Sequence, residues 1–239
     1  MKRHAALASC ALSIAVLTGL TACGSGDAET DAAADKPEAT AAPAKEVSPA
    51  ERLAKLVITT ADVEGHQVEE NKEEFLFAKS QDEVTLDKRE CAPLAYAMNQ
   101  LPVGEPQADL TRVASKDANA FTYVTLTAYE AGKAESAMSG LSKAVDSCGG
   151  GFTAKANGNT SPYDSVTAEK ADPAGDESLA FKSTLTFRGA THTVHAAAVR
   201  RDDVIAVYYA VDGLAIAQST PSDTKVSPVV AKAQNAKLG

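Results

Sequence analysis

Histidine and acidic side chains are the first candidates for chemistry, because they can hold a metal ion or transfer protons. After residue 22 the sequence has three histidines, His66, His192 and His195. If residues 191–200 form a strand, His192 and His195 point to opposite faces and cannot share a metal ion. Zinc needs three or four convergent ligands, and the sequence lacks that spacing. We therefore expect no metal site, and we expect both strand histidines to face solvent.

The acidic residues form two clusters, and neither has the pattern of a site. Residues 69–70 and 73–74 make an acidic patch without the alternating oxygen ligands of a calcium loop, so a solvated turn is favoured. Asp176 and Glu177 are adjacent, and we expect them to point apart. Carboxylates that point apart do not act together as general acid and general base on one scissile bond. A turn after Gly175 is therefore the favoured interpretation.

The remaining motifs give little support for catalysis. The chain has no Gly-x-Ser-x-Gly elbow and no phosphate-binding loop. Residues 149–151 are three glycines after a predicted helix, which favours a cap and loop over an anion site. Residues 159–161 match a glycosylation sequon, and we interpret them as a turn. Tyr208 and Tyr209 lie on opposite faces of a predicted strand, and core packing is favoured over lining a cleft. We expect no catalytic residue, no cofactor and no enzyme activity.

The first 22 residues have the order of an export signal. A basic start at residues 2–4 precedes an uncharged stretch of 16 residues, Ala5–Leu20. This stretch is too short for a comfortable membrane span, and the basic and apolar order is typical of a secretory signal. It ends in the sequence LTACG, in which two small residues precede Cys23.

This ending resembles the bacterial lipobox. The resemblance implies that the thiol of Cys23 is joined to diacylglycerol and that the signal is cut before Cys23, which becomes the first residue of the mature chain. Each buried methylene contributes about 0.8 kcal/mol, so two acyl chains anchor stably where one does not. The alternative is a signal cut after Ala22 that leaves a free thiol. We expect an acylated (palmitate-bearing) lipoprotein on the extracytoplasmic face of the cell membrane.

Composition separates a tether from the body. Residues 24–47 are rich in Ala, Asp, Glu, Thr, Pro and Gly, and no aromatic residue appears before Phe75, which predicts disorder. A flexible tether of this length reaches about 25–30 Å. Loss of residues 1–22 removes two basic residues and no acid, so the net charge moves from −9 to −11. The acyl chains, not a basic patch, must then hold the protein at the membrane, and a nucleic-acid partner is not expected.

The two remaining cysteines predict a disulfide. Cys91 and Cys148 lie on or beside the apolar faces of two predicted helices. Cys10 leaves with the signal and Cys23 is used for the lipid, and two thiols outside the cell should pair. Two buried free thiols are the alternative. The sequence has no Cys-x-x-Cys, which argues against a redox pair.

The body of the chain predicts an α+β fold. Ser48 and Glu51 form a capping box around Pro49 at the start of a first helix. Further helices are predicted over 92–101 and 130–148, strands over 111–116, 120–129, 178–188, 191–200 and 204–211, and a weak helix or frayed end over 225–238. The strand 204–211 is apolar on both faces, which indicates a central strand. Helices followed by a three-strand meander favour an antiparallel β-sheet with helices packed on it, in a single domain stapled by one disulfide.

A second resemblance covers residues 50–235. The helix that ends in Cys148-Gly149-Gly150, the Gly175-Asp176-Glu177 turn before a strand and the closing meander around Val199-Arg200-Arg201 are similar to the extracellular sensor domain of the mycobacterial H-type serine/threonine kinase and its lipoprotein relatives. The resemblance implies an antiparallel sheet, a cleft, and ligand sensing without catalysis. Abundant alanine is typical of a high-GC organism such as an actinobacterium.

These observations predict three domains and a function class. We expect a signal peptide at 1–22, the lipidated cysteine and acidic tether at 23–47, and an α+β sensor-like or ligand-binding domain at 48–239. The favoured function is non-enzymatic binding or sensing by a monomer, with an unknown small ligand or envelope protein as partner. A lipid or glycolipid carrier with an apolar cavity and a cell-envelope hydrolase are the alternatives.

Overall fold

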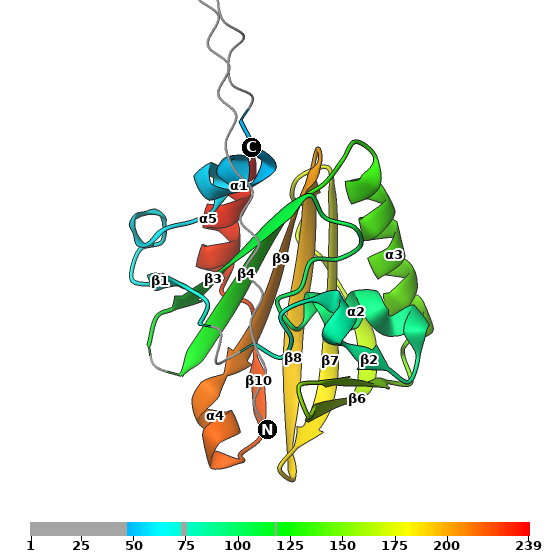
Figure 1. Cartoon of the computed structure of the whole chain (residues 1–239). Coiled ribbons are helices and arrows are strands. Elements are labelled where there is room, and N and C mark those ends of the chain that lie inside the picture. Colours follow the sequence, from blue (N-terminus) through cyan, green and yellow to red (C-terminus); the bar gives the residue numbers. More distant parts are fainter. Residues whose placement is uncertain (1–46, 73–75, 118) are drawn as a thin grey trace, which may run out of the picture. The chain divides into compact units, whose positions relative to one another are not determined.

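One large sheet forms the centre of the structure, a computed structural model that describes residues 47–72, 76–117 and 119–239 (Figure 1). The predicted signal peptide, Cys23, nearly all of the tether and residues 73–74 of the acidic patch lie outside this part. The strands follow the order β1-β3-β4-β9-β8-β7-β6-β5-β2, and each of these pairs is antiparallel. Their bounds are β1 (Gln67–Glu70), β2 (Thr85–Leu86), β3 (Ala108–Ser115), β4 (Ala120–Ala128), β5 (Phe152–Ala156), β6 (Asn159–Glu169), β7 (Glu177–Phe187), β8 (Ala190–Arg201), β9 (Val204–Asp212) and β10 (Ser222–Thr224).

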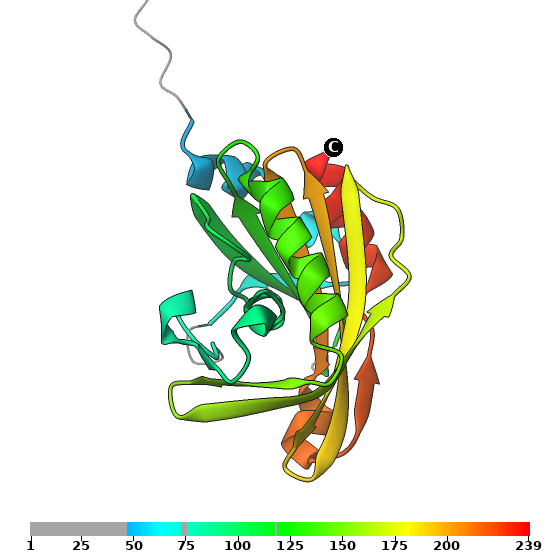
Figure 2. The same ribbon diagram turned by 90° about the vertical axis from the view of Figure 1, so that its right-hand side faces the viewer.

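Helices cover both faces of the sheet (Figures 1 and 2). On one face lie α1 (Pro49–Leu56) and α5 (Pro228–Leu238), and on the other lie α2 (Ala92–Ala97) and α3 (Lys133–Ser147). A short helix, α4 (Gly213–Gln218), follows β9, and 3₁₀ turns span Thr60–Asp62, Gln81–Glu83 and Arg89–Cys91. The predicted fold class, an antiparallel sheet with packed helices in one domain with one disulfide, is confirmed.

The strand β9 is the central strand that the sequence predicts. It lies between β4 and β8, and its side chains alternate between the two cores. Ile205, Val207 and Tyr209 pack beneath α2 and α3, whereas Val204, Ala206 and Tyr208 pack beneath α1 and α5. Apolar residues on both faces are therefore needed, because both faces are covered.

The C-terminal segment forms a helix, which decides between the two alternatives left by the sequence. Gln234 of α5 is fully buried. Its Oε1 accepts a hydrogen bond from the Ile58 N–H at 3.0 Å, and its Nε2 donates to the Leu56 carbonyl at 2.9 Å. These bonds satisfy backbone groups at the end of α1, and Val230 adds apolar burial on the same side of α5. Tertiary packing thus holds a helix that has little amphipathic pattern of its own.

Several boundaries differ from the sequence prediction. The helix predicted over 92–101 ends at Ala97, because Gln100 adopts a left-handed backbone with φ of 62°. The helix predicted from 130 begins at Lys133, after Gly132 with φ of 77°. The sequon at residues 159–161, interpreted as a turn, is the start of β6 instead. The turn itself is made by Asn157 and Gly158, both with positive φ.

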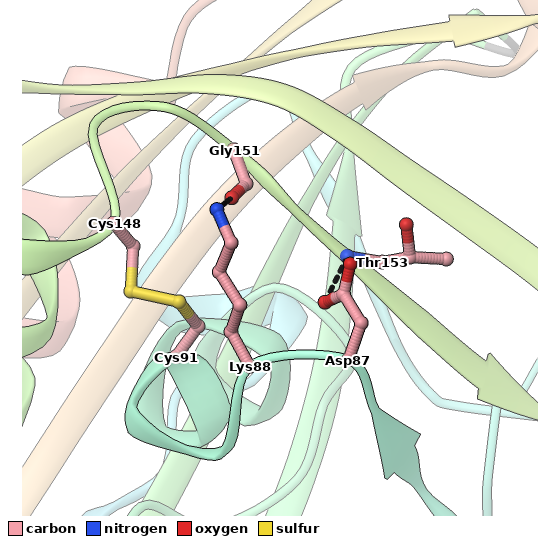
Figure 3. Close-up of a disulfide and its surroundings, with 6 residues drawn as sticks. All are labelled: Asp87, Lys88, Cys91, Cys148, Gly151 and Thr153. Atoms are coloured by element: carbon pink, nitrogen blue, oxygen red, sulfur yellow. Dashed lines mark hydrogen bonds between the residues drawn. A yellow bond between two sulfur atoms is a disulfide. The ribbon is translucent and has the colours of Figure 1, made fainter.

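The predicted disulfide is present. Cys91 and Cys148 are fully buried, their sulfurs lie 2.01 Å apart and their Cα atoms lie 6.0 Å apart (Figure 3). The bridge joins the start of α2 to the end of α3, after which residues 149–151 form the expected cap and loop. Beside it, Lys88 Nζ donates to the Gly151 carbonyl at 2.6 Å and the Thr153 N–H donates to Asp87 Oδ1 at 2.8 Å.

Candidate ligand-binding cleft

Strands β8 and β9 stop pairing partway along their length, which leaves an opening in the sheet. The last residue pair between these strands is Ala196 with Tyr209, and the short parallel strand β10 then takes the place of β9 beside residues 192–194. In Figure 2 the yellow-green hairpin of β5 and β6 projects from the sheet below α3. A cavity of about 650 Å³ lies at this end of the sheet, and we call it the central cleft. Its lining comes from residues 76–77, from the segment after α2, from the β5–β6 turn, and from β4 and β6–β10 with α4.

Tyrosine rings make one wall of the central cleft. Tyr123 of β4 and Tyr209 of β9 are cross-strand partners whose rings stack in parallel, with centroids 4.7 Å apart. Tyr209 is buried and Tyr123 is half-buried. A third tyrosine, Tyr163 of β6, is buried against Phe152 at a centroid distance of 4.7 Å. Each tyrosine ring of this wall stacks on a second aromatic ring, so the wall is preorganised.

Side-chain amides fix the phenol groups of this wall. Gln100 Nε2 donates to the Tyr209 hydroxyl, and Gln100 Oε1 accepts from Asn71 Nδ2. Asn99 Nδ2 donates to the Tyr163 hydroxyl at 2.8 Å and to the Ala95 carbonyl at 2.6 Å. The left-handed backbone at Gln100 places these two consecutive amides after the end of α2.

The phenols of the central cleft are neutral hydroxyl groups. Burial raises the pKa of Tyr163 to about 12, and burial also raises the pKa of Tyr209 well above its ordinary value. Burial acts in the same direction on Tyr123. At neutral pH these groups can therefore donate or accept hydrogen bonds, and they do not act as charged nucleophiles.

The two strand histidines are buried, which corrects the prediction that they face solvent. His192 is 3% exposed and His195 is 7% exposed. Their placement on opposite faces of β8 is as expected, since His192 lines the central cleft and His195 lies between two carboxylates. The sequence missed their burial because Ser222 and Asp223, which contact His192 and His195, lie in β10, a strand of three residues that the sequence did not predict.

His192 has an unpartnered ring nitrogen. Its Nδ1 lies 2.9 Å from the Ser222 hydroxyl of β10, whereas its buried Nε2 has no hydrogen-bond partner. A buried polar atom without a partner is costly, so such atoms are rare in folded proteins. His192 is thus a cleft-lining group that a ligand could satisfy.

The acidic candidates lie elsewhere and have structural partners. Asp176 and Glu177 both contact the Arg200 guanidinium, at 3.2 and 3.4 Å, and Asp176 also contacts Arg201 at 3.0 Å. Both carboxylates contact the Arg200 side chain instead of pointing apart. The reason is that β7, which begins at Glu177, pairs with β8, which contains Arg200. In the acidic patch, Glu70 contacts Arg112 at 3.2 Å.

Within residues 47–72, 76–117 and 119–239, no cluster of three His, Cys, Asp or Glu side chains could hold a metal ion. Over the same ranges, no helix has the length and apolar character to cross a membrane.

A second cavity lies on the opposite face of the sheet. It measures about 530 Å³ and is lined mainly by small apolar side chains of β7, β8 and α5, with Tyr208 of β9. The Tyr208 hydroxyl donates to Asn235 Oδ1 at 2.6 Å. The adjacent tyrosines thus have different roles: Tyr208 packs in the α1/α5 core, and Tyr209 lines the central cleft, a role the sequence ranked second.

Fold and cleft together define an antiparallel α+β domain with one open end. Among solved structures, the extracellular domain of PknH from Mycobacterium tuberculosis matches with a TM-score of 0.52 and 12% identity, over 81% of this chain and 95% of that chain. An uncharacterized protein (the Rv0999 ortholog) from Mycobacterium smegmatis matches at a TM-score of 0.36 and 13% identity, over 73% of this chain and 86% of that one. No protein-family model and no curated protein matches the sequence. The first match confirms the expected resemblance at the level of the fold.

Proposed function

We propose that this chain is a membrane-anchored extracytoplasmic lipoprotein whose domain binds a small ligand in the central cleft without catalysis. The observation that carries the proposal is the cleft itself, with its stacked tyrosines, fixed amides and unpartnered His192 nitrogen. Ligand pockets of this size are mostly apolar, with a few placed polar groups. The fold shared with a kinase's extracellular domain supports an extracytoplasmic sensing role.

The anchor is part of the same proposal. The lipobox-like sequence before Cys23 supports lipidation, and the predicted acidic tether then leads to the Ser48 capping box of α1. The buried disulfide also fits an oxidising compartment. We propose that the protein acts as a monomer, with a small ligand or an envelope protein as its partner.

Native mass spectrometry of protein extracted from its own envelope tests the proposal. The expected result is a co-purifying mass that is lost when Tyr123→Ala is introduced in the central cleft. A matched control is Tyr96→Ala, which removes a half-buried tyrosine of α2 outside the cleft and should retain the mass. An acyl lipid retained by Tyr123→Ala but lost from Ala197→Leu, which fills the second cavity, would overturn cleft binding and favour the carrier alternative.

A further inference from the structure

The described lining of the central cleft carries almost no charge. It contains no Lys, Arg or Glu, and its one carboxylate belongs to Asp212. Asp212 Oδ1 accepts the Ala215 N–H at 2.8 Å, so this carboxylate is engaged as the N-cap of α4. A phosphate or carboxylate ligand would lose its hydration without gaining a counter-charge there, which is strongly unfavourable. The lining therefore favours an uncharged ligand.

Apolar surface and hydrogen-bonding groups alternate within the same cleft. The half-buried ring of Tyr123 is backed by Tyr209, and Phe77 and Phe187 add further aromatic surface. The polar lining consists of amides and hydroxyls, namely Asn99, Gln100, Asn159, Thr160, Ser161, Thr193 and Ser222. Asn99, Gln100 and Ser222 already have hydrogen-bond partners within the protein. A purely hydrocarbon ligand would cover the polar groups of Asn159, Thr160 and Thr193 without pairing them, so the lining favours a ligand with polar groups at its edges.

The unpartnered ring nitrogen of His192 favours a ligand that carries a hydroxyl group. Its side chain is more than nine-tenths buried and lines the central cleft. A neutral imidazole nitrogen is either donor or acceptor, depending on the tautomer. A hydroxyl can donate to or accept from either form, whereas an ether or an ammonium group can serve only one.

We propose that the ligand of the central cleft is an uncharged carbohydrate. A sugar ring has an apolar face of C–H groups, which packs on an aromatic ring, and hydroxyls around its edge, which pair with amide, hydroxyl and imidazole groups. The ring of Tyr123 supports the apolar face, and Asn159, Thr193 and His192 line the same cavity. This inference rests on the proposed function and names the ligand class of the same cleft.

Tyrosine fluorescence gives a direct test, because the chain has no tryptophan and three of its six tyrosines line the central cleft. The mature protein is titrated with a panel of neutral gluco-, manno-, galacto- and arabino-oligosaccharides, and with uronic acid and sugar phosphate counterparts. At least one neutral member is expected to bind, and its acidic counterpart should bind at least about tenfold more weakly.

Cleft variants separate a specific site from weak surface binding. Tyr123→Ala and His192→Leu should each raise the Kd at least about fivefold, whereas Tyr123→Phe and Tyr96→Ala should leave it within about threefold. Circular dichroism and the unfolding midpoint establish that each variant is folded. Preferential binding of the acidic panel, or no Tyr123-dependent binding of any neutral member, overturns the carbohydrate assignment. If a non-sugar mass is still lost with Tyr123→Ala from the envelope-extracted protein, the cleft function stands and only the ligand class fails.

Discussion

Single carboxylates in this protein act as connectors between strands. Asp176 accepts the Asp202 N–H at 2.7 Å and contacts Arg200 and Arg201, so one side chain ties the start of β7 to the β8–β9 turn. Gly175 enables this contact, since an added Cβ would lie 2.3 Å from the Arg200 carbonyl oxygen. Asp176 therefore organises a turn, which is the role that the sequence favours for this acidic pair.

Acid should weaken the Asp176 connector. The Asp202 N–H, followed by Arg201, holds the pKa of Asp176 below its ordinary value. A carboxyl with a depressed folded-state pKa stabilises the fold above about pH 4 and loses that contribution as the pH falls through the folded value. Asp176→Asn should lower the free energy of unfolding at pH 7 and flatten its decline between about pH 4 and 2. Urea unfolding across this range measures both effects, and Asp172→Asn in the preceding loop is the control. Parallel curves for wild type and Asp176→Asn would contradict this role.

At the scale of elements, β10 is held by a histidine on each face of β8. Ser222 contacts His192, and Asp223 Oδ1 lies 2.5 Å from His195 Nε2. The other ring nitrogen, Nδ1 of His195, lies 2.7 Å from Glu169 Oε2 of β6. Ser222 of β10 also lines the central cleft, so these contacts connect β6 and β8 to the wall of the cleft.

Removal of the His195 side chain should therefore raise the pKa of Asp223 and weaken the attachment of β10 to the sheet. The hydrogen bond from His195 is the main cause that holds the pKa of Asp223 below its ordinary value, and Lys182 is the smallest of its causes. His195→Leu should raise the Asp223 pKa toward the ordinary value and speed amide exchange in residues 222–224. Lys182→Met should raise it by less. Carboxyl NMR titration and hydrogen exchange measure the two effects, and a larger shift with Lys182→Met would refute the arrangement.

The disulfide joins the start of α2 to the end of α3, and α2 leads into the segment that lines the central cleft. It closes a loop with a sequence separation of 57 residues, for which chain entropy predicts a stabilisation of about 4 kcal/mol. The double variant Cys91→Ala/Cys148→Ala should lower the free energy of unfolding by up to about that amount. Urea unfolding with and without reductant provides the measurement. Reductant should destabilise wild type and leave the double variant unchanged, and equal responses would contradict a bridge in the isolated protein.

Prediction from sequence succeeded where a local pattern was sufficient. Alternation of apolar and polar residues identifies β7, a run that is apolar on both faces identifies β9, and the spacing of apolar residues identifies α3. The β5–β6 hairpin was missed because β6 contains Asn159 and Pro162, which are typical of turns. The central cleft could not be derived from local patterns, because its lining combines the segment after α2 with residues of β4 and β6–β10 that are distant in the sequence. It also depends on the point at which β9 separates from β8.

At the scale of the whole molecule, the disulfide and the predicted lipid attachment use cysteines in separate parts of the sequence. Cys91 and Cys148 are used inside the fold, and Cys23 precedes it in a segment whose predicted role is attachment. The predicted mature chain would carry a net charge of −11, and a surface of this charge is repelled by anionic headgroups. Membrane association should then depend on one thiol.

Fractionation of cells that express Cys23→Ala tests this dependence. The variant should move from the membrane to the soluble fraction, because a chain without diacylglycerol loses about 0.8 kcal/mol of binding for each methylene that the lipid would bury. Cys10→Ala is the matched control, since it removes a thiol of the predicted signal and should leave the protein at the membrane. The Cys91–Cys148 bridge should form in both variants, which a thiol-labelling assay on unreduced protein can verify. Retention of folded Cys23→Ala at the membrane would show that another contact anchors the chain, and the ligand-binding domain would then have to be reconsidered as part of a membrane-bound complex.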